Sequence, residues 1–168
     1  MLDKWNVSNV KYIGGMFRYA RSFNQPLNKW NVSNVESMYK MFLNAESFNQ
    51  PLNKWNVSNV TSMNYMFRGA KSFNQSLNNW NVSNVRYMAG MFIGSRSFRQ
   101  PLHQRNVSTV ADMVGMCCSA SSFNQPLNNW NVSNDVTHMR EMFMNARSFN
   151  QPLHAPWYHE ESESDEEL

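Results

Sequence analysis

Apolar and polar residues recur along this chain with a fixed period of 25 residues. Tryptophan marks the period at Trp5, Trp30, Trp55, Trp80 and Trp130, and Arg105 takes the one missing position. Around these positions the unit reads approximately LNKWNVSNVxxMxxMFxxAxSFNQP. A period of this length is typical of proteins in which each unit forms one coil of a stack. The sequence therefore predicts six stacked coils.

The spacing of apolar residues changes within each unit. In the second unit Trp30 and Val32 alternate with a polar residue, as in a short strand, whereas the apolar positions from Val35 to Ala45 follow helical spacing. Each unit is therefore predicted to contain one strand and one short helix. The expected fold class is an α/β repeat solenoid of six strand–helix coils, extending over residues 1–158.

One unit cannot bury its own large side chains, so neighbouring units are expected to cover one another. Stacking places equivalent residues above one another in columns that form the core. Most of the thirteen methionines fall in such columns, where thioethers fill irregular gaps. The predicted core columns are Leu27, Leu52, Leu77, Leu102 and Leu127; Val32, Val57, Val82, Val107 and Val132; Met41, Met66, Met91, Met116 and Met142; and Phe48, Phe73, Phe98, Phe123 and Phe149.

The string FNQPLNKWNVSNVTSMNYMF, from Phe48 to Phe67, resembles the BspA-like leucine-rich-repeat family of bacterial and protist surface proteins and of large DNA viruses. The resemblance extends from Leu2 to Leu153. It implies a right-handed, leucine-rich-repeat-like solenoid with helices opposite the strands. It also implies adhesion or protein binding, but loosely, because a fold does not dictate a function.

Charge divides the chain into two parts. Six of the twelve acidic residues lie in the last nine positions, and all fifteen Lys and Arg residues precede them. The repeats therefore hold fifteen basic against six acidic residues, a net charge of +9. A segment as acidic as residues 159–168 is expected to be a disordered tail that folds back transiently on the basic repeats. The positive charge of the repeats is expected to attract acidic partners.

Basic residues align in two columns of the repeat. One column contains Arg21, Lys71, Arg96 and Arg147, with Glu46 and Ser121 at the other two positions, and a second contains Lys4, Lys29 and Lys54. We predict these seven cations as candidate interaction residues, against the alternative that they are ordinary solvated charge. Nucleic acid is the weaker partner, because the aromatic residues lie in core columns and no known RNA- or DNA-binding motif accompanies the charge.

The end of the stack is a second candidate interaction surface. No capping unit precedes Trp5, so Trp5, Phe17 and Phe23 are expected to be exposed and to dock onto a second copy or another protein. At the other end, Trp157 and Tyr158 are expected to cover the last coil. Within the stack, Arg105 is expected to lie between Trp80 and Trp130.

The residues that carry chemistry are scattered. His103 and His154 belong to different units, His138 has no ligand at metal-binding spacing, and the adjacent Cys117 and Cys118 replace ordinary unit positions. We therefore expect no catalytic residues, no cofactor and no metal, and no enzymatic activity.

The leading function is a non-catalytic protein-binding or structural scaffold, in a cell or a virus particle, since no export signal or membrane-spanning run is seen. One alternative is a cell-surface adhesin whose export signal is missing from this sequence. The other is a sequence-independent binder of nucleic acid or other polyanions. An upstream signal in the gene would favour the adhesin, and steep salt dependence on heparin or DNA would favour the polyanion binder.

Overall fold

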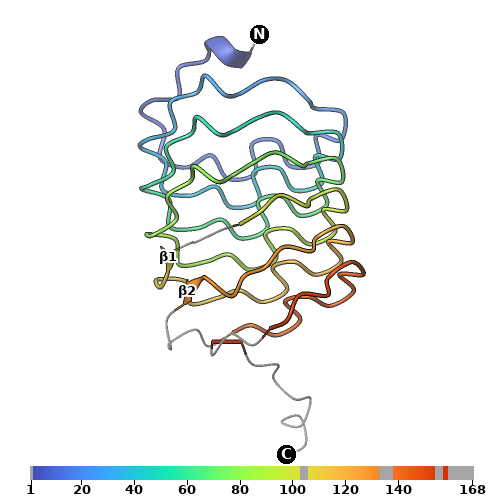
Figure 1. Ribbon diagram of the computed structural model, residues 1–168. Helices are drawn as coiled ribbons and strands as arrows, with labels where there is room; N and C mark the ends of the chain where they lie inside the picture. Colours follow the sequence, from blue (N-terminus) through green and yellow to red (C-terminus); the bar gives the residue numbers. More distant parts are fainter. Residues whose placement is uncertain (1, 103–105, 133–137, 154–156, 159–168) are drawn as a thin grey trace, which may run out of the picture.

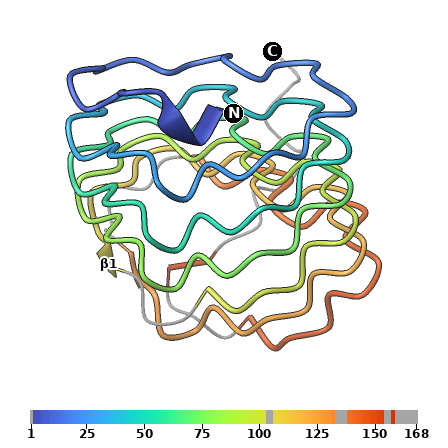
Figure 2. The ribbon, with the colours of Figure 1, turned by 90° about the horizontal axis from the view of Figure 1, so that it is seen from above.

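The computed structural model describes residues 2–102, 106–132, 138–153 and 157–158. The units form coils of similar outline that are stacked from one end of the molecule to the other (Figure 1), and seen from above they lie over one another (Figure 2). We number the coils 1 to 6 from the N-terminus. They begin at Leu2, Leu27, Leu52, Leu77, Leu102 and Leu127.

Parallel bridges join each coil to the next. They connect Tyr12 to Ser37, Ser37 to Ser62, Ser62 to Tyr87, Tyr87 to Asp112 and Asp112 to His138. The step is one repeat length until the last bridge, which is one residue longer because Asp135 is inserted in the sixth unit. The predicted six-unit register is therefore kept through the stack.

Regular secondary structure is scarce in the part of the chain that is described. A 3-10 helix, η1, covers Leu2–Lys4 at the N-terminal end of the stack. Two strands, β1 at Asn106–Val107 and β2 at Asn131–Val132, form a parallel pair in which Asn106 faces Asn131 and Val107 faces Val132. These strands lie in the predicted strand segment of the unit, but they are only two residues long.

The predicted strand–helix coil is wrong, because the segment expected to be helical consists of turns. In coil 2 this segment contains two residues with positive φ, Lys40 at 58° and Asn44 at 55°. A right-handed helix cannot pass through such residues. The same two positions have positive φ in every coil, at Gly15, Lys40, Tyr65, Gly90, Gly115 and Glu141 and at Tyr19, Asn44, Gly69, Gly94, Ser119 and Asn145.

The backbone hydrogen bonds of this segment alternate between two coils. The amide of Phe42 donates to the carbonyl of Met66 in the next coil, whereas the amide of Met41 donates to the carbonyl of Met38 in its own coil. An α-helix would direct both amides to carbonyls four residues earlier. The helical spacing of the apolar residues therefore reflects a series of tight turns that bring the same side chains to one side.

The distance between coils explains why turns replace helices. The rings of Phe42 and Phe67 lie 5.5 Å apart on one side of the interior, and those of Trp55 and Trp80 lie 6.5 Å apart on another. A helix with its side chains is about 10 Å wide. Coils this close together on both sides leave room for a single chain, but not for stacked helices.

The predicted core columns are confirmed. Every leucine, methionine and valine of these columns is buried except Val132, and Phe149 alone of the phenylalanines is partly exposed. Phenylalanine rings of successive coils stack, as Phe48 and Phe73 do at 5.9 Å. The core is therefore a set of continuous columns that pass through the whole stack.

Asparagine side chains satisfy backbone groups between coils. The Oδ1 of Asn24 accepts a hydrogen bond of 2.9 Å from the amide of Asn49 in the next coil, and Asn49 does the same for Asn74. The asparagine after each tryptophan behaves differently. Asn31 accepts from the amide of Ser33 in its own coil, which closes a local turn.

Candidate interaction surface

The predicted basic columns are exposed, but one of them is partly neutralised. Glu46 lies between Arg21 and Lys71, with its carboxylate oxygens 3.7 Å from the Arg21 Nε and 2.8 Å from the Lys71 Nζ. The hydrogen bond from Lys71 and the two positive charges hold the pKa of Glu46 below its ordinary value. Arg96 and Arg147, farther along the column, are exposed.

The second basic column lies on the surface of coils 1 to 3. Lys4, Lys29 and Lys54 are all exposed, one in each coil. A separate ion pair joins Lys11 to Glu36 at 2.8 Å, and it lowers the pKa of Glu36 and raises the pKa of Lys11. Exposed pairs such as these contribute little to stability. Their importance here is that Glu36 and Glu46 are already paired with Lys11, Arg21 and Lys71.

The structure brings together a group of side chains that the sequence interpretation did not single out as a site. Three tyrosines and three cations of coils 1, 2 and 3 lie in the segment of tight turns that replaces the predicted helix. We name this group the tyrosine–cation cluster. Its members are Arg18, Tyr19, Tyr39, Lys40, Tyr65 and Arg68.

Each cation of the cluster lies against a tyrosine ring. The Arg18 guanidinium is 4.7 Å from the centre of the Tyr19 ring, and its Nη2 donates a hydrogen bond of 3.2 Å to the Tyr19 hydroxyl. The Lys40 ammonium is 4.6 Å from the Tyr39 ring and 5.6 Å from the Tyr65 ring. These distances fall within the range of attraction between a cation and an aromatic ring face.

Arg68 completes the cluster, 5.8 Å from the centre of the Tyr65 ring, and the rings of Tyr39 and Tyr65 meet edge to face at 6.3 Å. The Tyr65 ring lies over Gly90 of the next coil, because a Cβ there would come within 2.5 Å of the ring carbon Cδ1. The missing side chain at Gly90 therefore makes room for Tyr65.

The cluster produces a positive potential at the surface. The hydrogen bond from Arg18 and its charge lower the pKa of the Tyr19 hydroxyl, and the charges of Lys40 and Arg68 act in the same direction. None of the three cations makes an ion pair with a carboxylate among the described residues. The sequence signal for this site was weak, since its tyrosines occupy different positions of the repeat.

The residues predicted at the end of the stack are only partly exposed. Trp5 is 57% exposed and stacks on Trp30 at 6.4 Å, and Phe23 is half-buried. Phe17 is 8% exposed, so the expectation that it faces solvent is wrong. Its ring packs between Phe23 of its own coil and Phe42 of the next, at 4.1 and 5.6 Å.

The opposite end is covered as expected. Trp157 stacks on Trp130 with ring centres 6.2 Å apart, and Tyr158 lies 5.8 Å from Phe143. The predicted position of Arg105 and the predicted tail at 159–168 fall outside the described residues. So do His103 and His154.

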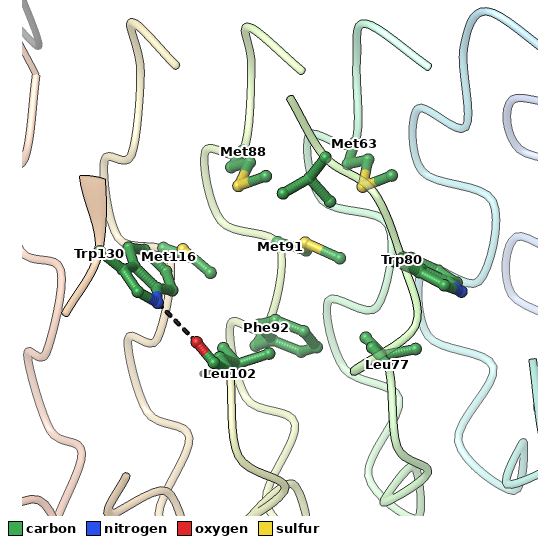
Figure 3. Close-up of a pocket in the computed structure, with 10 residues that line it drawn as sticks. Met63, Leu77, Trp80, Met88, Met91, Phe92, Leu102, Met116 and Trp130 are labelled. Carbon is green, nitrogen blue, oxygen red and sulfur yellow. Dashed lines mark hydrogen bonds between the residues drawn. The ribbon is translucent and has the colours of Figure 1, made fainter. Parts of the chain in front are cut away.

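The interior contains a small apolar cavity of about 20 Å³ beside Trp80 and Trp130 (Figure 3). Both indoles flank the coil whose unit has no tryptophan, and the Trp130 Nε1 donates a hydrogen bond of 2.6 Å to the Leu102 carbonyl. The methionines that line the cavity are Met63, Met88, Met91 and Met116. A space of this size holds about one water molecule, so it is a packing defect rather than a ligand pocket.

The cysteines lie inside the stack. Cys117 and Cys118 are both buried and unpaired, and burial raises the pKa of the Cys117 thiol well above its ordinary value. Over the described part of the chain, no group of three His, Cys, Asp or Glu side chains is arranged to hold a metal ion. Within the same residues, no helix has the length and hydrophobicity to cross a membrane.

Comparison with known proteins identifies a family for the repeats. The family model described as Mycoplasma protein of unknown function, DUF285, matches residues 1–104 and 77–167, so that together the two matches cover nearly the whole chain. No curated protein and no solved structure matches the chain.

Proposed function

The chain belongs to the DUF285 family, and we propose that it is a non-catalytic protein-binding or structural scaffold. We also propose the finer relationship to BspA-like repeat proteins, which rests on the string from Phe48 to Phe67. Stacked coils suit this role because each coil adds surface without altering the core.

The observation that supports the proposal best is the division between buried and exposed positions. The repeated tryptophans, leucines and phenylalanines form the core columns, while the tyrosine–cation cluster occupies exposed or half-buried positions that differ from coil to coil. Three cations lie beside aromatic rings and form no ion pair with a carboxylate in the part of the chain that the structure describes. They form a surface suited to a negatively charged partner.

A comparative binding experiment tests the proposal. The wild-type chain is immobilised, and bound proteins from its native source are identified by mass spectrometry. The test variant is Arg18→Glu, Arg68→Glu, and the control is Arg86→Glu, Arg99→Glu, which reverses two exposed cations of coil 4 outside the cluster. We expect one defined set of proteins on the wild type and the control that is lost from the test variant.

A different result would contradict the proposal. If the chain retains nucleic acid and no protein, the polyanion-binding alternative is correct instead. Turnover of a small-molecule substrate by the purified chain would contradict the non-catalytic part of the proposal.

A further inference from the structure

We propose that the tyrosine–cation cluster binds an extended acidic protein segment that runs along the stack axis and presents carboxylates at positions i and i+3. This inference rests on the proposed function as a protein-binding scaffold and adds the chemistry and direction of the partner. It follows from the placement and spacing of Arg18, Lys40 and Arg68, and from the absence of ion pairs between them and the described carboxylates.

The cations are held in place before a partner arrives. Arg18 contacts the ring and the hydroxyl of Tyr19, and Lys40 lies near the rings of both Tyr39 and Tyr65. A long cationic side chain normally loses conformational entropy when it is immobilised in a complex. The tyrosines reduce that cost because they restrict the cations in the free protein.

Among the described residues, no carboxylate forms an ion pair with a cation of the cluster. Of the described carboxylates in coils 1 to 3, Glu36 is paired with Lys11, and Glu46 is paired with Lys71 and Arg21. A partner that supplies carboxylates therefore makes new ion pairs at this surface without breaking existing ones. Carboxylates also suit Arg18 and Arg68 geometrically, because a guanidinium can donate two parallel hydrogen bonds to one of them.

The separation of the two arginines sets the spacing of the ligand. Arg18 and Arg68 occupy the same unit position two coils apart, and the phenylalanine rings beside them are separated by 5.6 Å between coils 1 and 2 and by 5.5 Å between coils 2 and 3. Coils joined by parallel bridges are about 4.8 Å apart, so the two arginine positions are about 10 Å apart along the axis, and an extended peptide covers roughly this distance in three residues. Carboxylates at positions i and i+3 match this distance, and Lys40 lies between them in coil 2.

The state of the tyrosine rings favours a protein segment over single-stranded nucleic acid. Nucleic-acid binders of that class offer free ring faces on which bases stack. Here the rings of Tyr19, Tyr39 and Tyr65 are each already in contact with a cation of the cluster. A base could stack only on a ring face that no cation occupies, whereas carboxylates can approach the cations directly from solvent.

Two synthetic peptides of identical composition provide the test. The first has three glutamates separated by two serines each, and the second has the three glutamates adjacent to one another. Fluorescence anisotropy with the full chain at low salt should show that the spaced peptide binds about three- to tenfold more tightly, the effect of one or two additional exposed ion pairs. Arg18→Glu, Arg68→Glu should remove this preference, and Arg86→Glu, Arg99→Glu should keep it.

A second variant tests the role of the rings. Tyr65→Phe keeps the aromatic face for Lys40 and Arg68 and should bind the spaced peptide as the wild type does, whereas Tyr65→Leu should bind it more weakly. Thermal melts of both variants establish that they are folded.

Three outcomes would overturn the inference: equal affinity for the two peptides, retention of the preference in the Arg18→Glu, Arg68→Glu variant, or tighter binding of an oligonucleotide of equal charge at the same residues. If the natural partner binds the wild type and the cluster variant equally, this inference fails while the scaffold proposal stands. If no protein partner binds at all, the scaffold proposal itself fails.

Discussion

The indole Nε1 of Trp55 donates a hydrogen bond of 3.0 Å to the carbonyl oxygen of Leu27, which lies in the preceding coil. The same bond joins Trp80 to Leu52 at 3.0 Å and Trp30 to Leu2 at 2.8 Å. Each indole thus connects two coils through a polar bond and also stacks in an apolar column. Tryptophan meets both requirements, because it combines a large apolar ring with one donor.

Replacing Trp55 with phenylalanine should therefore destabilise the stack. Phenylalanine preserves most of the ring packing but removes the buried hydrogen bond to Leu27, so we expect a loss of about 1 to 3 kcal/mol in the free energy of unfolding. The matched control is Trp5→Phe, at a ring that is 57% exposed, and it should change stability by less than about 0.5 kcal/mol. Urea unfolding measures both, and equal losses would contradict this account of the indole.

Gly90 and Gly94 allow the cost of a left-handed backbone to be measured separately from the cost of a steric clash. Gly90 and Gly94 have φ of 58° and 65°, but an added Cβ meets the Tyr65 ring at 2.5 Å in the first case and nothing within 4 Å in the second. Gly94→Ala should cost about 1 kcal/mol from the left-handed backbone alone. Gly90→Ala should cost more by thermal melting and should also weaken peptide binding, since Tyr65 must move; equal costs would mean that Tyr65 does not need this space.

The stability of the chain should fall in acid partly through Glu36 and Glu46. Both carboxyl groups have a pKa below the ordinary value of 4.5, because Lys11 donates to the first and Lys71 to the second. A lowered pKa in the folded state stabilises the fold above the unfolded pKa, and this contribution is lost as the pH falls through the folded pKa. Glu36→Gln, Glu46→Gln should therefore lose less stability than the wild type between about pH 6 and about pH 3.

Salt provides the control for that prediction. Both pairs are exposed, so roughly 1 M salt should screen them and make the wild type resemble the double variant. An acid-induced change in melting temperature that is identical for both proteins at low salt would show that these pairs do not contribute.

Removing residues 160–168 should raise the affinity for acidic peptides and other polyanions. This segment contains six acidic residues, among them Glu160, Glu163 and Glu166 at intervals of three. We expect a segment with this spacing to compete with an added ligand for the tyrosine–cation cluster. Anisotropy titrations of the full and shortened chains at low salt measure the effect. Equal affinities would show that this segment does not compete for the cluster.

The repeat period and the core follow from the sequence alone. A period of 25 residues places Leu27, Leu52 and Leu77 at equivalent positions, and any stack of equivalent coils brings such residues into register. The buried columns could therefore be predicted without knowing the local conformation of the coil. The covering of the last coil by Trp157 could likewise be predicted, because the repeat ends before this residue.

The conformation between the columns was decided by the tertiary structure. Val35, Met38, Met41 and Phe42 have the spacing of a helix, and this spacing alone cannot distinguish a helix from turns that bury the same side chains. The 5.5 Å separation of Phe42 and Phe67 excludes the helix, and that separation depends on contacts between coils rather than within one.

The candidate site was also decided by the tertiary structure. Tyr19, Tyr39 and Tyr65 occupy three different positions of the repeat, and only the close stacking of coils 1 to 3 brings them and their cations to one part of the surface. The sequence by itself determined which columns of the repeat form the core, since burial within the stack follows from periodicity. The neighbours of an exposed side chain depend on how adjacent coils are packed, and that depends on the whole structure.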